Sequence, residues 1–272
     1  MTKARIAAWF CQLAISGGFF AAYGALAAPC RFQPEPGVTV VVHASGAGLF
    51  AKVGPAPQIR LGDPLVAHDR IGISFQDADF DGHKDIVVEA DRGMADVSFA
   101  VYLWRTPGRF VRAFDIADHS TTTFQNMEFL PKQRIMRSTG QSGGNFYDDR
   151  WKPVGDGFTR TMATIGSVDA PPPFDGCVCA QYWTIAGREL PSRLVCPSQP
   201  ALAQRHVRVD RASLYTEKEQ SEKGWLIKGD AVELLCWSFA YAASDGTDFR
   251  VLVRFRGQQT LVRWVNFADL GP

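Results

Sequence analysis

Four aspartates stand close together in one short segment, and their spacing fits the binding of a cation. The segment reads Asp77-Ala-Asp79-Phe-Asp81-Gly82-His83-Lys-Asp85, with carboxylates at positions 1, 3, 5 and 9 and glycine at position 6. Ca2+ takes about six to eight oxygen ligands, and alternate side chains of a tight loop can converge on one point. Gly82 permits the sharp turn, and the main-chain carbonyl of His83 can add an oxygen. The pattern predicts a Ca2+ site made by Asp77, Asp79, Asp81, His83 and Asp85.

The alternative for this segment is a solvated acidic turn without an ion. Carboxylates crowded into so short a loop repel one another, at a cost of about 1 to 4 kcal/mol for each close pair, and solubility alone does not require that arrangement. Mg2+ fits less well because it keeps several waters in rigid octahedral geometry. Position 12, where an EF-hand has a bidentate glutamate, is Val88. The segment instead resembles the calcium loops between strands of integrin-type β-propeller repeats, which implies a structural ion and a His83 without catalytic duty.

One segment matches the pattern of a catalytic serine. Gly140-Gln-Ser142-Gly-Gly144 fits G-x-S-x-G, a motif that requires a strand, a sharp turn and then a helix. The following residues, Asn145 to Pro153, leave no room for that helix. A secreted serine hydrolase therefore stays a remote alternative. The chain also has no H-E-x-x-H and no Walker loop, and we expect that it is not an enzyme.

Composition indicates an all-β protein. The 25 glycines, 16 prolines and 19 phenylalanines favour strands and turns. Apolar or β-branched runs at 38–42, 85–89, 97–104 and 121–129, and a second series between 214 and 265, read as strands. A hydrophobic content of 46% with 21% charged residues supports an ordinary core. The net charge of +1 offers no surplus for steering phosphates, which argues against a nucleic-acid partner.

The first 27 residues have the anatomy of a secretory signal peptide. Lys3 and Arg5 precede a largely apolar stretch, and Ala25-Leu26-Ala27 is a small-x-small cleavage site. A retained membrane anchor is the alternative, although glycines interrupt the stretch and weaken it as a span. Pro29 disfavours a lipid anchor at Cys30. We expect a periplasmic protein that has no membrane span in its mature form.

Export changes the interpretation of the cysteines, because an oxidising compartment favours disulfides. Cleavage would remove Cys11 and leave Cys30, Cys177, Cys179, Cys196 and Cys236. Five is an odd number, so at least one thiol is expected to stay unpaired or to pair between chains. Zinc binding by the Cys177-x-Cys179 pair is the alternative.

A triple proline, 171–173, divides the mature chain. We expect a calcium-loop β domain at 30–170, which is propeller-like or otherwise antiparallel. A connector containing proline and cysteine follows at 171–200, and a second β domain follows at 201–272.

Residues 71–165 resemble bacterial periplasmic lysozyme-inhibitor and immunity proteins. The matching features, in order, are the Asp77–Asp85 loop, the Val101–Trp104 strand, a basic-aromatic turn to Phe110, an amphipathic segment 126–130, a Gly-rich loop ending in Tyr147, Trp151, and a return strand at Phe158. The resemblance implies a partner that is a peptidoglycan hydrolase or secreted toxin. It also implies that a loop containing Ser142, Gly143, Asn145 and Tyr147 enters the active site of that enzyme. The alternative is a plain hairpin turn with Tyr147 in the core.

Residues 207–270 resemble bacterial SH3-type domains. The matching pieces are Ala212–Tyr215, Leu226–Val232 and Arg263–Leu270. The resemblance implies an SH3-like barrel and a groove for cell-wall peptides lined by Tyr215 and Trp264, unless both side chains are core. It leaves a second function open, a non-catalytic peptidoglycan-binding module of the cell envelope.

Overall fold

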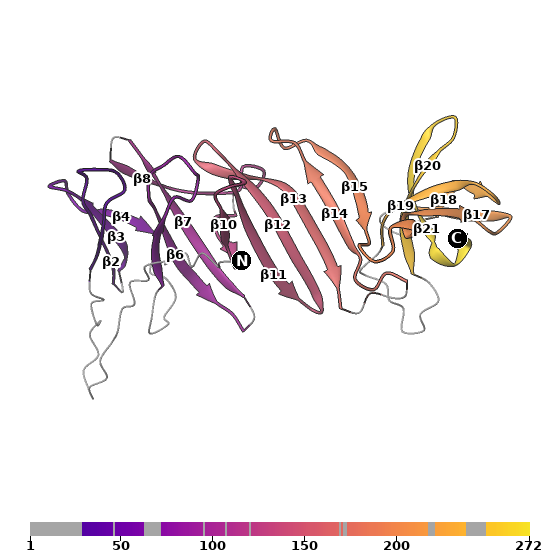
Figure 1. Ribbon diagram of the computed structural model, residues 1–272, viewed down its shortest axis with the longest axis horizontal. Helices are drawn as coiled ribbons and strands as arrows, with labels where there is room; N and C mark the ends of the chain where they lie inside the picture. The colour runs from indigo at the N-terminus through magenta and orange to yellow at the C-terminus, as the bar shows by residue number, and fades with distance from the viewer. Residues whose placement is uncertain are drawn as a thin grey trace, which may run out of the picture. The chain divides into compact units, whose positions relative to one another are not determined.

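The computed structural model is all-β, as the composition predicts (Figure 1). It describes residues 29–45, 47–62, 72–94, 96–106, 108–119, 121–168, 170, 173–216, 221–237 and 249–272. The expected signal peptide, 1–27, lies outside these residues. Within the described ranges the only helices are two short 3-10 turns, η1 (Pro200–Ala203) and η2 (Phe267–Asp269). Neither they nor any other helix there has the length and apolarity needed to cross a membrane.

Two antiparallel meanders begin the chain. The first sheet has the order β1-β2-β3-β4, formed by β1 (Cys30–Phe32), β2 (Val40–Ser45), β3 (Gly48–Val53) and β4 (Ile59–Gly62). The second has the order β5-β6-β7-β8, formed by β5 (Ile73–Gln76), β6 (Asp85–Arg92), β7 (Val97–Arg105) and β8 (Arg109–Arg112), and β9 (Phe124–Gln125) also pairs with β7. Four-stranded meanders are the units of β-propellers, and the propeller-like arrangement of this region stays a prediction.

Two larger sheets follow. The third runs β10-β11-β12-β13-β14-β15, formed by β10 (Glu128–Leu130), β11 (Ile135–Ser142), β12 (Asn145–Val154), β13 (Gly157–Ser167), β14 (Val178–Trp183) and β15 (Glu189–Val195). The fourth runs β18-β17-β21-β20-β19-β16-β22, formed by β16 (Gln204–Val207), β17 (Arg211–Tyr215), β18 (Ser221–Ile227), β19 (Ala231–Trp237), β20 (Arg250–Arg256), β21 (Thr260–Asn266) and β22 (Leu270–Gly271). The SH3-like barrel stays a prediction for the fourth sheet.

The chain divides into two compact units. The first holds the residues up to Gly140 together with Arg150–Arg160, and the second holds Gln141–Asp149 together with Thr161–Pro272. The division falls inside β11, β12 and β13. The stretch 171–200, expected as a connector, belongs to the second unit and forms β14 and β15.

The central parts of β6 and β7 are buried on both faces, which explains the apolar runs Ile86–Val88 and Ala100–Trp104. Successive side chains of a strand point to opposite faces. One face carries Ile86, Val88, Ala100, Tyr102 and Trp104, which pack with residues of β1, β2 and β3. The other carries Val87, Val101 and Leu103, which pack with residues of β11, β12 and β13. The second sheet is therefore the middle layer of the first unit, and the acidic loop begins at this layer.

The expected strand 121–129 is interrupted. The structure has only β9 and β10 there, because Asn126 adopts a positive φ of 38° that a continuous strand does not allow. The Asn126 amide group donates hydrogen bonds to the Asp96 carboxylate at 2.6 Å and to the Thr139 carbonyl at 3.0 Å. These bonds hold the break in place.

Two disulfides lie in the second unit. They join Cys177 to Cys196 and Cys179 to Cys236. A disulfide sulfur offers no thiolate, so the zinc alternative for Cys177 and Cys179 is wrong. No described cysteine is free, and the expectation of an unpaired thiol stays a prediction for the mature chain. That expectation counted the cysteines of a cleaved chain. The disulfides indicate an oxidising compartment.

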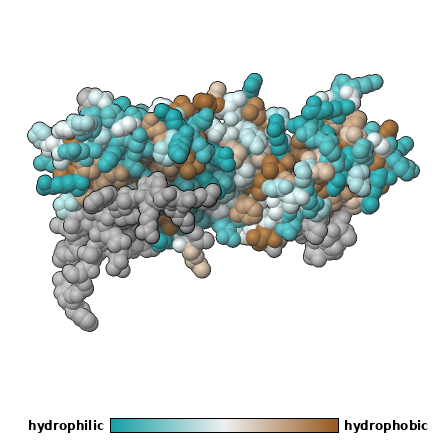
Figure 2. All heavy atoms as spheres, viewed as in Figure 1, coloured by the Kyte–Doolittle hydropathy of each residue, from teal (hydrophilic) through white to brown (hydrophobic). Residues whose placement is uncertain are grey.

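On the face that Figure 2 shows, hydrophobic patches are separated by hydrophilic side chains. The most exposed large apolar side chains among the described residues include Met94, Val168, Ile185, Trp225 and Ile227.

Candidate functional site

The acidic loop connects β5 to β6, and hydrogen bonds from its backbone amides to its own carboxylates stabilise its conformation. The Asp77 carboxylate accepts hydrogen bonds from the backbone amides of Asp81 and Gly82, both at 3.0 Å. Phe80 and Gly82 adopt positive φ values of 62° and 98°. Gly82 takes that conformation at no steric cost, which is the role the sequence assigns to it.

Asp85 closes the loop from the inside of the first unit. It starts β6 and is fully buried. One carboxylate oxygen accepts the backbone amide of Ala78 and the other accepts that of Trp104, each at 2.7 Å. Burial raises the pKa of Asp85 to about 8. The amides of Trp104 and Ala78 oppose that rise, and the nearby Asp79 and Asp81 carboxylates add to it. Asp85 thus holds the loop against β7 at a high electrostatic cost.

Arg105, at the end of β7, is a counterion that sequence reasoning missed. Its guanidinium donates to the Asp79 carboxylate at 2.7 Å and to the Asp156 carboxylate at 2.9 Å. It also donates to the Gly155 carbonyl at 2.7 Å. Burial raises the pKa of Asp79, the hydrogen bond from Arg105 lowers it, and Asp81 raises it further. No sequence signal pairs Arg105 with Asp156, because they are 51 positions apart.

The structure brings three of the predicted ligands together. Asp77, Asp79 and Asp85 each offer a carboxylate oxygen, and these atoms lie within 4.8 Å of one another. Such a set can hold a metal ion, since each carboxylate oxygen keeps a second lone pair after accepting one hydrogen bond, from a backbone amide or, at Asp79, from Arg105. The single positive charge of Arg105 lies against the carboxylates of Asp79, Asp81 and Asp156, so the loop can accommodate added positive charge.

Asp81 and His83 are not part of that three-carboxylate group. Asp81 is exposed, accepts the backbone amide of His83 at 2.8 Å and lies 3.8 Å from Arg105. The imidazole of His83 lies 3.7 Å from the Glu35 carboxylate. Both residues shape the outer side of the loop.

The Gly-rich segment is a tight hairpin at the junction of β11 and β12. Ser142 ends β11 and Asn145 begins β12, and the two glycines between them have positive φ values of 55° and 80°. Positive φ at both central positions defines the type I′ turn that suits two-residue hairpins. Ser142 therefore sits before a strand and not before a helix, so it lacks the setting of a catalytic elbow.

The side chains beyond this turn reach solvent. Tyr147 is 37% exposed and Phe146 is 39% exposed, so the alternative of a core Tyr147 is wrong. The Phe146 ring lies directly on Gly166 of β13, where a side chain would clash with it. Phe146 is thus anchored on its own sheet, and Tyr147, the next residue along the strand, projects from the opposite face.

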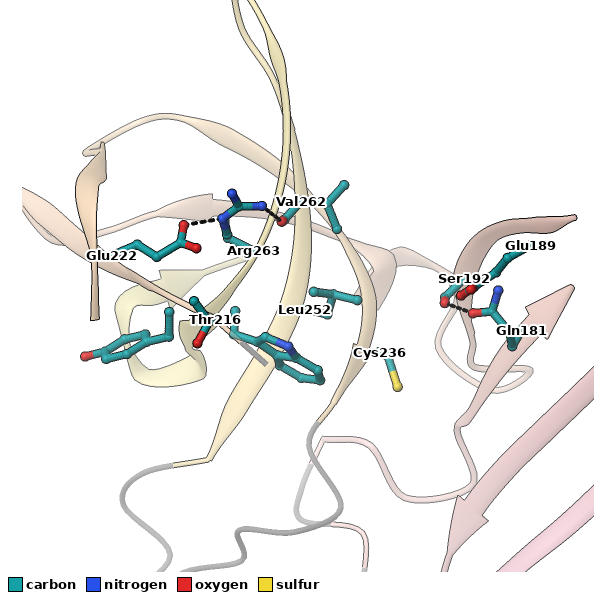
Figure 3. Close-up of a pocket in the computed structure, with 11 residues that line it drawn as sticks. Gln181, Glu189, Ser192, Thr216, Glu222, Cys236, Leu252, Val262 and Arg263 are labelled. Atoms are coloured by element: carbon teal, nitrogen blue, oxygen red, sulfur yellow. Dashed lines mark hydrogen bonds and ion pairs between the residues drawn. The ribbon is translucent and has the colours of Figure 1, made fainter. Parts of the chain in front are cut away.

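A pocket of about 560 Å³ lies in the second unit and contains both predicted groove residues, Tyr215 and Trp264. Each is half-buried, and their backbones are register partners on β17 and β21. The guanidinium carbon of Arg250 stands 3.8 Å from the centroid of the Tyr215 ring. Figure 3 shows Glu222 and Arg263 at one side of the pocket and Gln181, Ser192 and Glu189 at the other. The pocket therefore reaches beyond the fourth sheet to β14 and β15.

No family model, curated protein or solved structure matches this chain. The candidate sites therefore rest on their own geometry.

Proposed function

We propose that this protein is a non-enzymatic periplasmic inhibitor or immunity protein that blocks a peptidoglycan hydrolase. The observation that carries the proposal is the β11–β12 hairpin, a two-glycine turn with an exposed tyrosine behind it. A narrow turn of this kind can enter an enzyme cleft. Because two antiparallel strands already fix its backbone, little conformational entropy is lost on binding.

The side chains of the hairpin suit the active site of a glycan-cleaving enzyme. Such enzymes use a pair of carboxyl groups. The Ser142 hydroxyl and the Asn145 amide can donate hydrogen bonds to those carboxylates. Tyr147 supplies an aromatic anchor of the kind that dominates protein interfaces. The oxidising compartment indicated by the disulfides is consistent with a periplasmic target.

We further propose that Ca2+ binds the loop 77–85 and stabilises the first unit. Asp77, Asp79 and Asp85 supply the inner oxygens, and the expected ligands Asp81 and His83 would complete the shell. Ca2+ binds the folded loop and not the unfolded chain, so it stabilises the fold by mass action. The test is a melting curve of the full chain with excess Ca2+ and with EDTA. An identical melting temperature in the two would remove the metal from the proposal.

The inhibitor proposal is tested with the purified chain and a panel of wall hydrolases. The wild-type protein is expected to lower the turnover of at least one of them on peptidoglycan. Tyr147→Ala is expected to raise the inhibition constant by about tenfold or more, as for an interface anchor. Trp225→Ala is the matched control, because it removes another exposed aromatic ring of the second unit that is far from the hairpin in sequence. Equal inhibition by the Tyr147 variant would exclude the hairpin as the inhibitory element.

A non-catalytic peptidoglycan-binding module is the second candidate, and the pocket around Tyr215 and Trp264 favours it. This function predicts that the chain sediments with insoluble peptidoglycan and that Trp264→Ala abolishes sedimentation without unfolding the protein. Inhibition without sedimentation would favour the first candidate, and sedimentation without inhibition the second.

A further inference from the structure

The pocket of the second unit has a volume that suits a small molecule or one segment of a larger ligand. Small-ligand sites commonly enclose about 300 to 1,000 Å³, and this one encloses about 560 Å³. All of its lining residues belong to the second unit. Their side chains fall into an apolar set and a polar set, and the combination indicates the ligand.

The apolar set comes from two neighbouring strands. Leu252 of β20 and Trp264 of β21 are register partners, and Val262 stands two residues before Trp264 on the same strand. Arg250 already occupies a face of the Tyr215 ring. The half-buried Trp264 is therefore the aromatic group on which a ligand can pack.

The polar set includes Thr216, Glu189 and two preformed pairs that lie on opposite sides of the apolar residues (Figure 3). In one pair, Arg263 donates to the Glu222 carboxylate, and its guanidinium also donates to the Val262 carbonyl at 2.8 Å. A guanidinium has five N–H donors and a carboxylate has two oxygens, so this pair presents unused donors beside an unused acceptor. The two charges compensate each other.

The second pair joins β15 to β14. The Ser192 hydroxyl donates to the side-chain carbonyl of Gln181, and the amide group of Gln181 donates to the Leu190 carbonyl at 2.6 Å. These bonds fix the orientation of the amide before any ligand arrives. This side of the pocket is also polar, and it carries no charge except that of the exposed Glu189.

A neutral polyhydroxylated ring matches this arrangement best. Each hydroxyl donates one hydrogen bond and accepts others, so two adjacent hydroxyls can pair with the adjacent carboxylate and guanidinium of Glu222 and Arg263. The C–H face of a sugar ring can pack on Trp264 and Leu252, while its other hydroxyls reach Gln181 and Ser192. An anionic ligand is disfavoured, because the lining carboxylates outnumber the guanidinium. A cationic peptide would depend on Glu189, and an exposed ion pair contributes only about 0 to 1 kcal/mol.

We propose that this pocket is a saccharide-binding site that takes a neutral hexopyranose unit of an oligosaccharide. The site goes beyond the proposed inhibitor function and does not depend on it, since the hairpin residues are not among its lining side chains. It also differs from the wall-peptide groove expected from the resemblance to SH3-type domains.

The test is calorimetric titration of the full chain with three probes. They are chitotriose and maltotriose, which are neutral trisaccharides, and the amidated tripeptide Ala-Lys-Ala, which is cationic. We expect at least one trisaccharide to bind with a dissociation constant of about 10 µM to 5 mM, and the peptide to bind more weakly. If neither trisaccharide binds at concentrations up to about 20 mM, or if only the peptide binds, the proposal is overturned.

Two variants and one control locate the binding. Trp264→Ala and Arg263→Met are each expected to weaken trisaccharide binding by about tenfold or more. Arg263→Met is less liable to unfold the protein, because Arg263 is partly exposed and methionine keeps the aliphatic part of its side chain. Trp225→Ala removes an exposed tryptophan that does not line the pocket, and its affinity is expected to stay within about twofold of the wild type. Unchanged affinity in a folded Arg263→Met variant would place the saccharide elsewhere and refute the assignment.

Discussion

Asp85 is expected to make the stability of the metal-free protein fall steeply with pH. Its pKa rises from an ordinary value of 3.8 to about 8 in the folded chain. Each unit corresponds to about 1.4 kcal/mol, so ionising this carboxyl in the folded state costs about 6 kcal/mol. The stabilities of typical domains are about 5 to 15 kcal/mol. Ionisation of this one buried group is therefore large enough to unfold a marginal unit.

The sign of the effect follows from proton linkage. Because the folded-state pKa lies above the unfolded one, the folded chain binds the extra proton between about pH 4 and pH 8. The contribution of Asp85 is fully present below pH 4 and is lost as the pH rises through about 8. Within this window the free energy of unfolding should fall by about 1.4 kcal/mol per pH unit. Ca2+ competes with the same proton, so its affinity should rise with pH over this range.

Urea unfolding in EDTA at several pH values between 5 and 9 measures this slope. Asp85→Asn is the comparison, because it keeps the size of the side chain and does not titrate. Asn loses one of the two backbone amide bonds, which costs about 1 to 3 kcal/mol at every pH. The difference in the free energy of unfolding between the wild type and the variant should therefore shrink as the pH rises. The electrostatic argument would be refuted if the free energies of unfolding of the two proteins changed in parallel with pH, or if the Asp85 carboxyl resonance titrated near pH 4.

Two further predictions concern the contacts that hold each unit. Arg105→Met should lower the free energy of unfolding of the first unit by about 3 kcal/mol in EDTA, because it leaves the buried Asp79 without its guanidinium; Ca2+ should restore part of the loss, and a denaturation curve that matches the wild type would contradict the role of Arg105. Replacing Cys179 and Cys236 together by serine should destabilise the second unit by about 4 kcal/mol, since the disulfide closes a loop with a sequence separation of 57. Thermal melting under non-reducing conditions tests this prediction, and an unchanged melting temperature would show that the disulfide between β14 and β19 does not stabilise the second unit.

The strands of the middle layer were predictable because their apolar runs have one simple cause. The runs at 85–89 and 97–104 became β6 and β7, since a strand buried on both faces has no need of polar alternation. The sequence alone does not show which neighbour each face meets. That depends on the partner sheets, whose residues come from β1 to β3 on one side and from β11 to β13 on the other.

Other features escaped prediction because they depend on distant partners. The stretch 171–200 looked like a linker because of its prolines, yet its strands β14 and β15 pair with each other. The Cys177–Cys196 disulfide joins the residues next to these two strands, and the Cys179–Cys236 disulfide joins β14 to β19. Cysteine spacing does not fix connectivity, so these pairings could not be read from the sequence. Asn126 broke an expected strand because its partners, Asp96 and Thr139, lie 30 and 13 positions away. Local propensity carries no information about such bonds.

The acidic loop was recognisable from spacing, but its electrostatics follow from burial. The aspartate pattern predicted Asp77, Asp79, Asp81 and Asp85 as ligands of one site and treated all four alike, whereas the structure brings together only Asp77, Asp79 and Asp85. The structure separates them, because Asp85 starts a strand that is enclosed on both faces and Asp81 remains in solvent. The same enclosure that makes β6 a strong structural element therefore makes Asp85 costly to ionise. A cation at this loop would relieve that cost where β6 enters the middle layer, so metal binding should change the stability of the whole first unit and not only that of the loop.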